Sequence, residues 1–273
     1  MRGESLWPRL ASGGVIAVAI LAAVTCSQAT ARADEALDAL LAAYPEHLAG
    51  YDATDLIWKD GTRMPLGDET KRGFAETLKQ PTIRDQFAIP YPLGKPARAP
   101  AENEDPGRFR NDAFFIKMYG DCRKGEVSRR LKAVAWLPSR KGGTVMVTSV
   151  NGVAEKLAAV SRELDALPAE MTQYLVPSAG TYNCRPVQDT GNLSVHAYGA
   201  AIDLATKFGD YWLWAKGRSG GALPYRNRFP HEIVEIFERH GFIWGGRWYH
   251  YDTFHFEYRP ELIALARKGW PGR

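Results

Sequence analysis

Residues 194–203 read Ser194-Val195-His196-Ala197-Tyr198-Gly199-Ala200-Ala201-Ile202-Asp203. From Gly199 onward the pattern predicts a strand in which Ile202 faces the core and Asp203 faces the other side, because successive side chains of a strand alternate. Ala201 shares the face of Asp203, and its small size leaves room above the sheet for an ion and a substrate. His196 has the wrong parity to share that face in an unbroken strand. We therefore expect the backbone to turn at Gly199, which tolerates such a turn.

A second polar cluster occupies residues 252–257 and reads Asp252-Thr253-Phe254-His255-Phe256-Glu257. The spacing of Asp252 and His255 brings two side chains to one face in a helical turn but not in a strand. We expect a turn that leads into a strand starting near His255. In that strand His255 and Glu257 share a face, and the two phenylalanines point into the core.

The two clusters together offer the donors of a metal site. His196, Asp203 and His255 supply two imidazoles and a carboxylate, a set typical of catalytic zinc, which takes three protein ligands and leaves the fourth position to water. Simpler roles are a salt bridge or strand end for Asp203 and a buried or surface position for each histidine. Asp252 is then the expected acceptor of a proton from the water that the metal activates. Glu257 is the competing acid, and we expect it to orient a ligand.

The patterns Ser-x-His-x-x-Gly-x-Ala-x-Asp and acid-x-x-His resemble the zinc peptidases of the D-alanyl-D-alanine carboxypeptidase family, often grouped as LAS-type metallopeptidases. This family includes the L-alanyl-D-glutamate endopeptidases of phage lysins and shares its fold with lysostaphin-type enzymes. The resemblance covers residues 110–270 and implies that His196, Asp203 and His255 bind Zn²⁺ and that Asp252 is the catalytic base. Where the dipeptidase branch has Glu, this chain has Asp252, as the endopeptidase-like branch often does. This difference from the dipeptidase branch bears on which substrate is cleaved more than on the type of reaction.

Three further residues are candidates for the site. In the family, an arginine upstream of the first motif stabilises the substrate carbonyl or carboxylate, which by position implies Arg185. Its simpler role is that of a surface cation. Ser194 is expected to contact substrate or to serve as a plain turn residue. His250 lies in the aromatic run 242–256, so we expect it to line a cleft and contact substrate rather than bind metal.

The first 33 residues have the composition of a cleaved signal peptide. Arg2 and Arg9 precede an apolar run at 15–24, and Ala31-Arg32-Ala33 supplies small residues for cleavage. The run is shorter than the roughly 20 apolar residues of a spanning helix, so we expect a periplasmic or secreted protein without stable membrane insertion. Removing this segment takes away three basic residues and one acidic residue, which leaves 35 − 3 = 32 against 31 − 1 = 30 and a net charge of about +2. Such a balance gives no reason to expect nucleic acid as a partner.

Export leaves two cysteines, Cys122 and Cys184, for an oxidising compartment. There an isolated pair is more simply interpreted as one disulfide than as two buried thiols that never meet.

The remaining chain divides by pattern into two parts. Residues 34–107 are expected to form an accessory region and connector, with helices at 35–44 and 69–78, a turn at Asp60-Gly61, and a region rich in Pro and Gly at 89–107. Residues 108–273 are expected to form the zinc peptidase domain. The elements expected there are strands at 133–137 and 144–148 and helices at 151–167, with Asn151 as cap, 230–240 and 260–267.

Hairpin strands with intervening helices indicate an α+β fold with a mainly antiparallel sheet flanked by helices. The resemblance implies the hedgehog/DD-peptidase-like version of this class. The functional hypothesis is an exported zinc metallopeptidase that hydrolyses peptidoglycan stem peptides, with carboxypeptidase and endopeptidase activity both open. A binding module that keeps the metal and holds wall polymer without hydrolysis is the alternative, and such a module has no need for an acid at Asp252.

Overall fold

A computed structural model describes residues 35–68, 70, 72–187, 190–216 and 223–272. The expected signal peptide, residues 1–33, lies outside the described residues. Among the described helices, none is both long and apolar enough to span a membrane.

The strands form three small antiparallel sheets rather than the one main sheet expected from the sequence. The sheets are β1 (Leu48–Tyr51), β2 (Asp55–Trp58) and β3 (Arg63–Pro65); β4 (Leu131–Ala135) and β5 (Thr144–Thr148); and β6 (Ala201–Asp203), β8 (His255–Tyr258) and β7 (Phe242–Trp244), in that order. The strands are too short to join the three sheets into one. A backbone hydrogen bond from Thr148 to the Gly199 carbonyl, 2.9 Å, ties the second sheet to the third.

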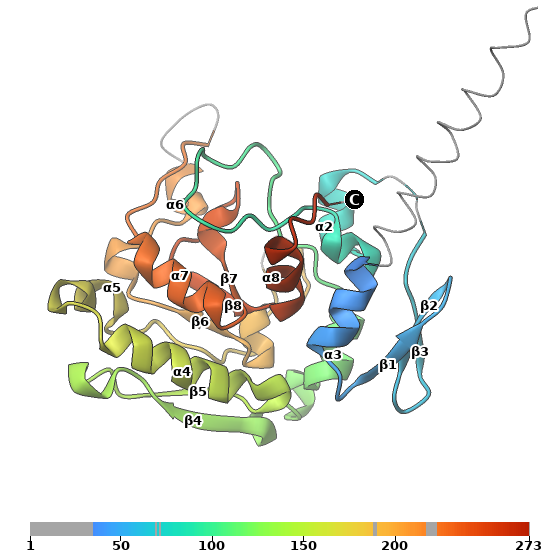
Figure 1. The fold of residues 1–273 in the computed structure, drawn as a ribbon, viewed down its shortest axis with the longest axis horizontal. Helices are drawn as coiled ribbons and strands as arrows, with labels where there is room; N and C mark the ends of the chain where they lie inside the picture. The colour runs from blue at the N-terminus through green and yellow to red at the C-terminus, as the bar shows by residue number, and fades with distance from the viewer. Residues whose placement is uncertain (1–34, 69, 71, 188–189, 217–222, 273) are drawn as a thin grey trace, which may run out of the picture.

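The helices are short except for α4. They are residues 35–43, α2 (Phe74–Lys79), α3 (Asp112–Tyr119), α4 (Val153–Asp165), α5 (Thr172–Leu175), α6 (Trp212–Lys216), α7 (His231–Arg239) and α8 (Pro260–Arg267). In Figure 1, α4 lies between the β4–β5 hairpin and α7, and α7 covers β7. Phe237 of α7 stacks on Phe256 of β8 with ring centroids 3.9 Å apart. Burying such a side chain contributes about 1.5–3 kcal/mol, so this contact helps to fix the strand that carries His255.

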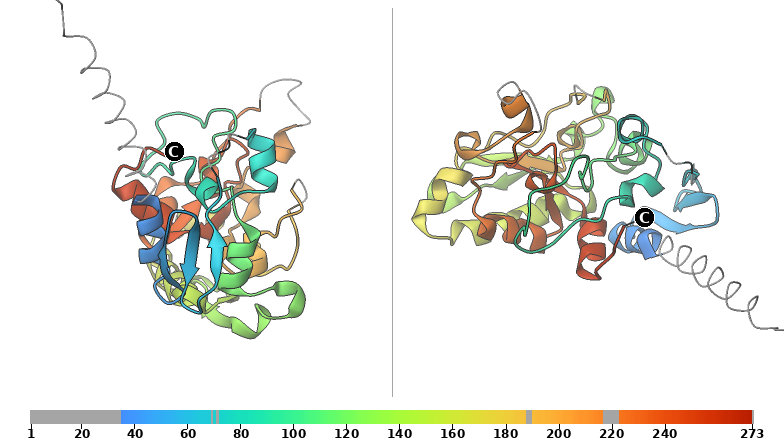
Figure 2. Two further views of the ribbon diagram at one scale, coloured as in Figure 1. Left: turned by 90° about the vertical axis from the view of Figure 1, so that its right-hand side faces the viewer. Right: turned by 90° about the horizontal axis from the view of Figure 1, so that it is seen from above.

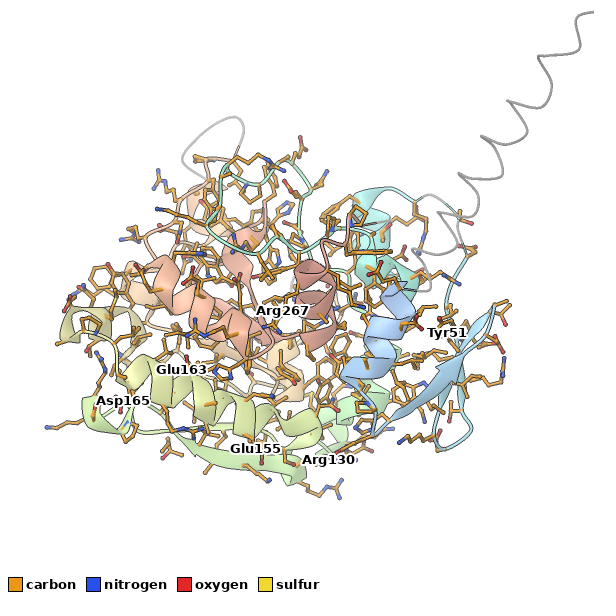
Figure 3. All side chains as sticks on the ribbon, viewed as in Figure 1. Tyr51, Arg130, Glu155, Glu163, Asp165 and Arg267 are labelled. Carbon is orange, nitrogen blue, oxygen red and sulfur yellow. A yellow bond between two sulfur atoms is a disulfide. The ribbon has the colours of Figure 1, made fainter. Side chains whose placement is uncertain are left out.

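An ion pair also joins α4 to α7. Glu163 of α4 accepts a hydrogen bond of 2.5 Å from Arg239 of α7, and Glu163 lies on the side of α4 that faces α7 (Figure 3). At the far end of the molecule, Tyr51 of β1 donates to Asp38 of the first helix, 2.8 Å.

Two local predictions are wrong. Asn151 does not cap α4: it has a φ of 56°, and Gly152, with a φ of 69°, is the capping residue. A capping side chain needs an extended backbone to reach the first free amides, and a left-handed residue cannot offer one. The helix expected at 69–78 begins only at Phe74, after Gly73.

The other expected elements are present within a residue or two, and the 89–107 segment contains neither helix nor strand. The predicted disulfide is confirmed: Cys122 and Cys184 are bonded, with their Cα atoms 5.7 Å apart.

The N-terminal region shares one core with the rest of the described chain. Tyr44 donates to Glu261 of α8 at 2.7 Å, and Tyr91 donates to Glu238 of α7 at 2.8 Å, both buried. Trp248 is tied to the connector as well, because its indole donates to the Pro106 carbonyl at 2.7 Å. Figure 2 shows the β1–β3 sheet at one end of the molecule, and its residues Leu48, Leu56 and Trp58 belong to the same core.

Candidate metal centre

Two neighbouring strands and one turn position the three predicted ligands. Asp203 of β6 pairs directly with His255 of β8 in the antiparallel register. His196 comes from a short 3₁₀ helix, Val195–Tyr198, which ends at Gly199 with a φ of 65°. The structure therefore has the turn expected at Gly199.

The three donor atoms form a nearly equilateral triangle. His196 Nε2 lies 3.1 Å from His255 Nδ1 and 3.2 Å from Asp203 Oδ1, and the last two atoms are 2.9 Å apart. Tetrahedral zinc, with bonds of about 2.0–2.1 Å, separates its ligand atoms by about 3.3 Å. The triangle thus has the size that such an ion requires, and these three residues are a group that could hold a metal.

The outer nitrogen of each imidazole is held by an acceptor. His196 Nδ1 lies 2.8 Å from the carbonyl oxygen of Thr181, and His255 Nε2 lies 3.1 Å from Oε2 of Glu257. A carbonyl and a carboxylate can only accept, so these outer nitrogens carry hydrogen. The inner nitrogens then present lone pairs to the centre, which is how metal-binding histidines are usually oriented.

The electrostatics of the cluster call for a positive charge at its centre. Burial lowers the pKa of His255, but hydrogen bonds to Asp203 and Glu257 outweigh it and raise the pKa to about 10. Lone pairs that face each other at these distances repel unless a proton or a cation lies between them. The donor set, its spacing and this demand for charge all fit a divalent cation.

Glu257 is fully buried and paired on both sides. Arg110 Nη2 lies 3.0 Å from its Oε2, and Arg259 Nη1 lies 3.5 Å from its Oε1. Burial raises the pKa of Glu257, but the charge of Arg110 and the hydrogen bond from His255 lower it by more. The net pKa is below its ordinary value, so the group is ionised. As expected, Glu257 shares a face with His255.

Asp252 lies beside the cluster with one oxygen unsatisfied. Its backbone carbonyl accepts from the His255 amide at 3.2 Å, in the turn expected from the sequence. Its Oδ1 is buried and has no hydrogen-bond partner among the described residues. Burial, and next the charge of Asp203, raise the pKa of Asp252 to about 7. A cation held by the three ligands would lower this pKa and favour the carboxylate.

The centre opens into a cavity of about 90 Å³. Arg185 lines it, is exposed and makes no ion pair with a described residue. Two further arginines that were not predicted, Arg108 and Arg110, also line it, and both lie within 6.0 Å of the Trp248 ring. Their one sequence signal is the Arg-x-Arg alternation that directly follows the connector.

Ser194 and His250 also line the cavity. Ser194 Oγ accepts from the His196 amide at 3.4 Å and so caps the turn that carries this ligand. His250 Nδ1 is 2.6 Å from Asp105, outside the ligand triangle.

This arrangement is typical of metal-dependent hydrolases. The family model for D-alanyl-D-alanine carboxypeptidase matches residues 188–258, which confirms the resemblance over this segment. The match contains His196, Asp203, Asp252 and His255, whereas Arg185 lies outside it. No curated protein and no solved structure matches the chain at a significant level.

The turn at Gly199 gives a first testable prediction. A Cβ atom there would lie 2.8 Å from Leu131 Cδ2 and 3.0 Å from the Thr148 amide nitrogen, and its φ is positive. We expect Gly199→Ala to lose about 1–2 kcal/mol of unfolding free energy from the left-handed backbone and about 1–3 more from crowding. Denaturant unfolding measures this loss.

Gly125→Ala is the matched control, because Gly125 has a φ of 70° and a Cβ there would meet only Ser128 Oγ at 3.7 Å. Equal losses in the two variants would show that crowding at Gly199 contributes nothing.

Proposed function

We propose that the chain is an exported zinc metallopeptidase, with a hedgehog/DD-peptidase-like fold, that hydrolyses peptide bonds in peptidoglycan stem peptides. The observation that carries the proposal is the convergence of His196 Nε2, Asp203 Oδ1 and His255 Nδ1, each within 3.2 Å of the others. The family match over residues 188–258 supports the substrate class. A periplasmic or secreted location follows from the composition of residues 1–33 and from this substrate.

Each side chain has a distinct role in this proposal. His196, Asp203 and His255 would hold the metal, and Thr181 and Glu257 fix the two rings. Bound zinc polarises a carbonyl and makes water a stronger acid.

Asp252 accepts the proton of the attacking water and returns it to the leaving amine. Its partnerless, buried Oδ1 favours this assignment, since Glu257 is occupied by His255 and two arginines. In this proposal Arg185, which is exposed and lines the cavity, holds the carbonyl oxygen or a terminal carboxylate.

Digestion of purified peptidoglycan tests the function. Native protein, chelator-treated protein and chelated protein with zinc restored are incubated with cell-wall sacculi, and the muropeptides are separated and weighed. We expect new peptide fragments with the native and restored samples and none with the chelated one, because without the metal the carbonyl is not polarised and the water is not activated.

The masses identify the bond. Loss of one terminal residue indicates trimming, and opened cross-links or a freed glycan indicate internal cleavage. Identical fragments in all three samples would rule out a metal-dependent peptidase. Sedimentation with the sacculi without any fragments would favour the binding module instead.

A further inference from the structure

A second hollow adjoins the metal centre. It has a volume of about 310 Å³, and its outer wall is α2, with Phe74, Leu78 and Lys79. Arg108, Trp212 and His250 line both hollows and so form the border between them. Since α2 lies outside residues 188–258, this wall is a feature of this chain rather than of the matched segment.

The border is built by the N-terminal region. Asp105, fully buried, accepts from His250 through both its backbone amide, 2.9 Å, and its Nδ1, 2.6 Å, and it also pairs with Arg108 at 3.0 Å. The His250 ring stacks on Phe74 with an interplanar angle of 19° and meets Trp212 edge-on. These contacts hold the border side chains in place before any ligand arrives.

The wall is anchored to the matched segment as well. Asn192 donates from Nδ2 to the carbonyl oxygens of Leu78 and Lys79, at 3.2 and 3.0 Å, at the C-terminal end of α2. The backbone at Lys79 is therefore held in place. The side chain of Lys79 is exposed and makes no ion pair with a described residue.

The charge of the two hollows is unbalanced. Their described lining includes four cations, Lys79, Arg108, Arg110 and Arg185. Arg108 is paired with Asp105 and Arg110 with Glu257, so the cations in the lining that make no ion pair with a described residue are Lys79 and Arg185. The carboxylates in that lining are Asp203 and Asp252, both assigned to the metal centre. A ligand that bridges the hollows would therefore bind best if it carried a negative charge beyond the metal centre.

We propose that the second hollow is a subsite for a carboxylate-bearing peptide residue, with Lys79 as its charge partner and Phe74, Leu78 and Trp212 as its apolar contacts. The proposal rests on the proposed peptidase function and deepens it. The substrate is a peptide that continues past the scissile bond across the Arg108–His250 border.

Equilibrium binding tests the subsite without catalysis. The probes are two synthetic stem pentapeptides that differ only in the glutamate α-carboxyl group, free in one and amidated in the other. Isothermal titration calorimetry with chelated full-length protein is expected to show that the free acid binds about two- to fivefold more tightly, the range expected of one exposed ion pair. Equal affinity for both peptides would overturn the subsite.

Three variants locate the charge partner. Lys79→Gln is expected to abolish the preference for the acid, and Leu78→Glu, which adds a carboxylate to the hollow, to reverse it. Lys59→Gln removes an exposed cation from the β2–β3 turn and should leave the preference intact. A preference that persists in both Lys79→Gln and Leu78→Glu would contradict the proposal.

The subsite and the peptidase function fail in different ways. A wild-type protein that binds the acid selectively but cuts no peptidoglycan would refute the function and keep the subsite. An active enzyme that binds both pentapeptides equally would refute only the subsite.

Discussion

Asp252→Asn is expected to reduce kcat/KM on a stem peptide by about 10²–10⁴-fold, the usual contribution of a general acid–base group. The amide keeps the shape of the carboxylate but accepts no proton, and Asp252 Oδ1 has no described partner whose loss would disturb the fold. Initial rates with a labelled peptide measure the effect, and metal content is measured on the same samples.

The same variant also changes the pH dependence. A base works only when ionised, so wild-type activity is expected to rise with pH through the pKa of Asp252. Burial and Asp203 raise that pKa to about 7 without metal, and a bound cation would lower it. The acidic limb should be missing in Asp252→Asn. Asp210→Asn is the control, because Asp210 pairs with Arg228 and does not line the metal centre. Full activity of Asp252→Asn would assign the base to another group, and loss of bound metal would make Asp252 a ligand.

The sequence predicted the local geometry of the site better than its surroundings. The turn at Gly199 and the strand beginning at His255 follow from parity and spacing, which are properties of neighbouring residues. The register that places Asp203 opposite His255 joins segments far apart in the chain, and no local pattern encodes it.

The arginines illustrate the same limit. Arg185 was a candidate because of its position in a known pattern, whereas Arg108 and Arg110 reach the cavity only because the connector folds back over Trp248. The N-terminal region was expected as an accessory unit. Its first helix and the Asp60-Gly61 turn were predicted, but not strand β1, the start of α2, the shared core or the border residues that it fixes.

Glu257 links the stability of the core to the affinity of the metal centre, and Glu257→Gln is expected to reduce both. The variant leaves Arg110 and Arg259 without their buried anion, and breaking a buried pair in this way costs about 3–5 kcal/mol. It also weakens the acceptor that orients the His255 ring, which typically lowers metal affinity by about 10–100-fold. Denaturant unfolding of chelated protein measures the first effect, and competition with a zinc chelator measures the second.

Glu238→Gln separates the two effects, because Glu238 is also a buried carboxylate paired with an arginine, Arg247 at 2.9 Å, but contacts no predicted ligand. We expect it to lose a comparable free energy of unfolding and to keep wild-type zinc affinity. If Glu257→Gln, like Glu238→Gln, binds zinc as tightly as the wild type, then the His255–Glu257 hydrogen bond does not orient the His255 ring for metal binding. Weaker zinc binding in both variants would instead mean that general loosening of the core, rather than the acceptor at His255 Nε2, controls the affinity.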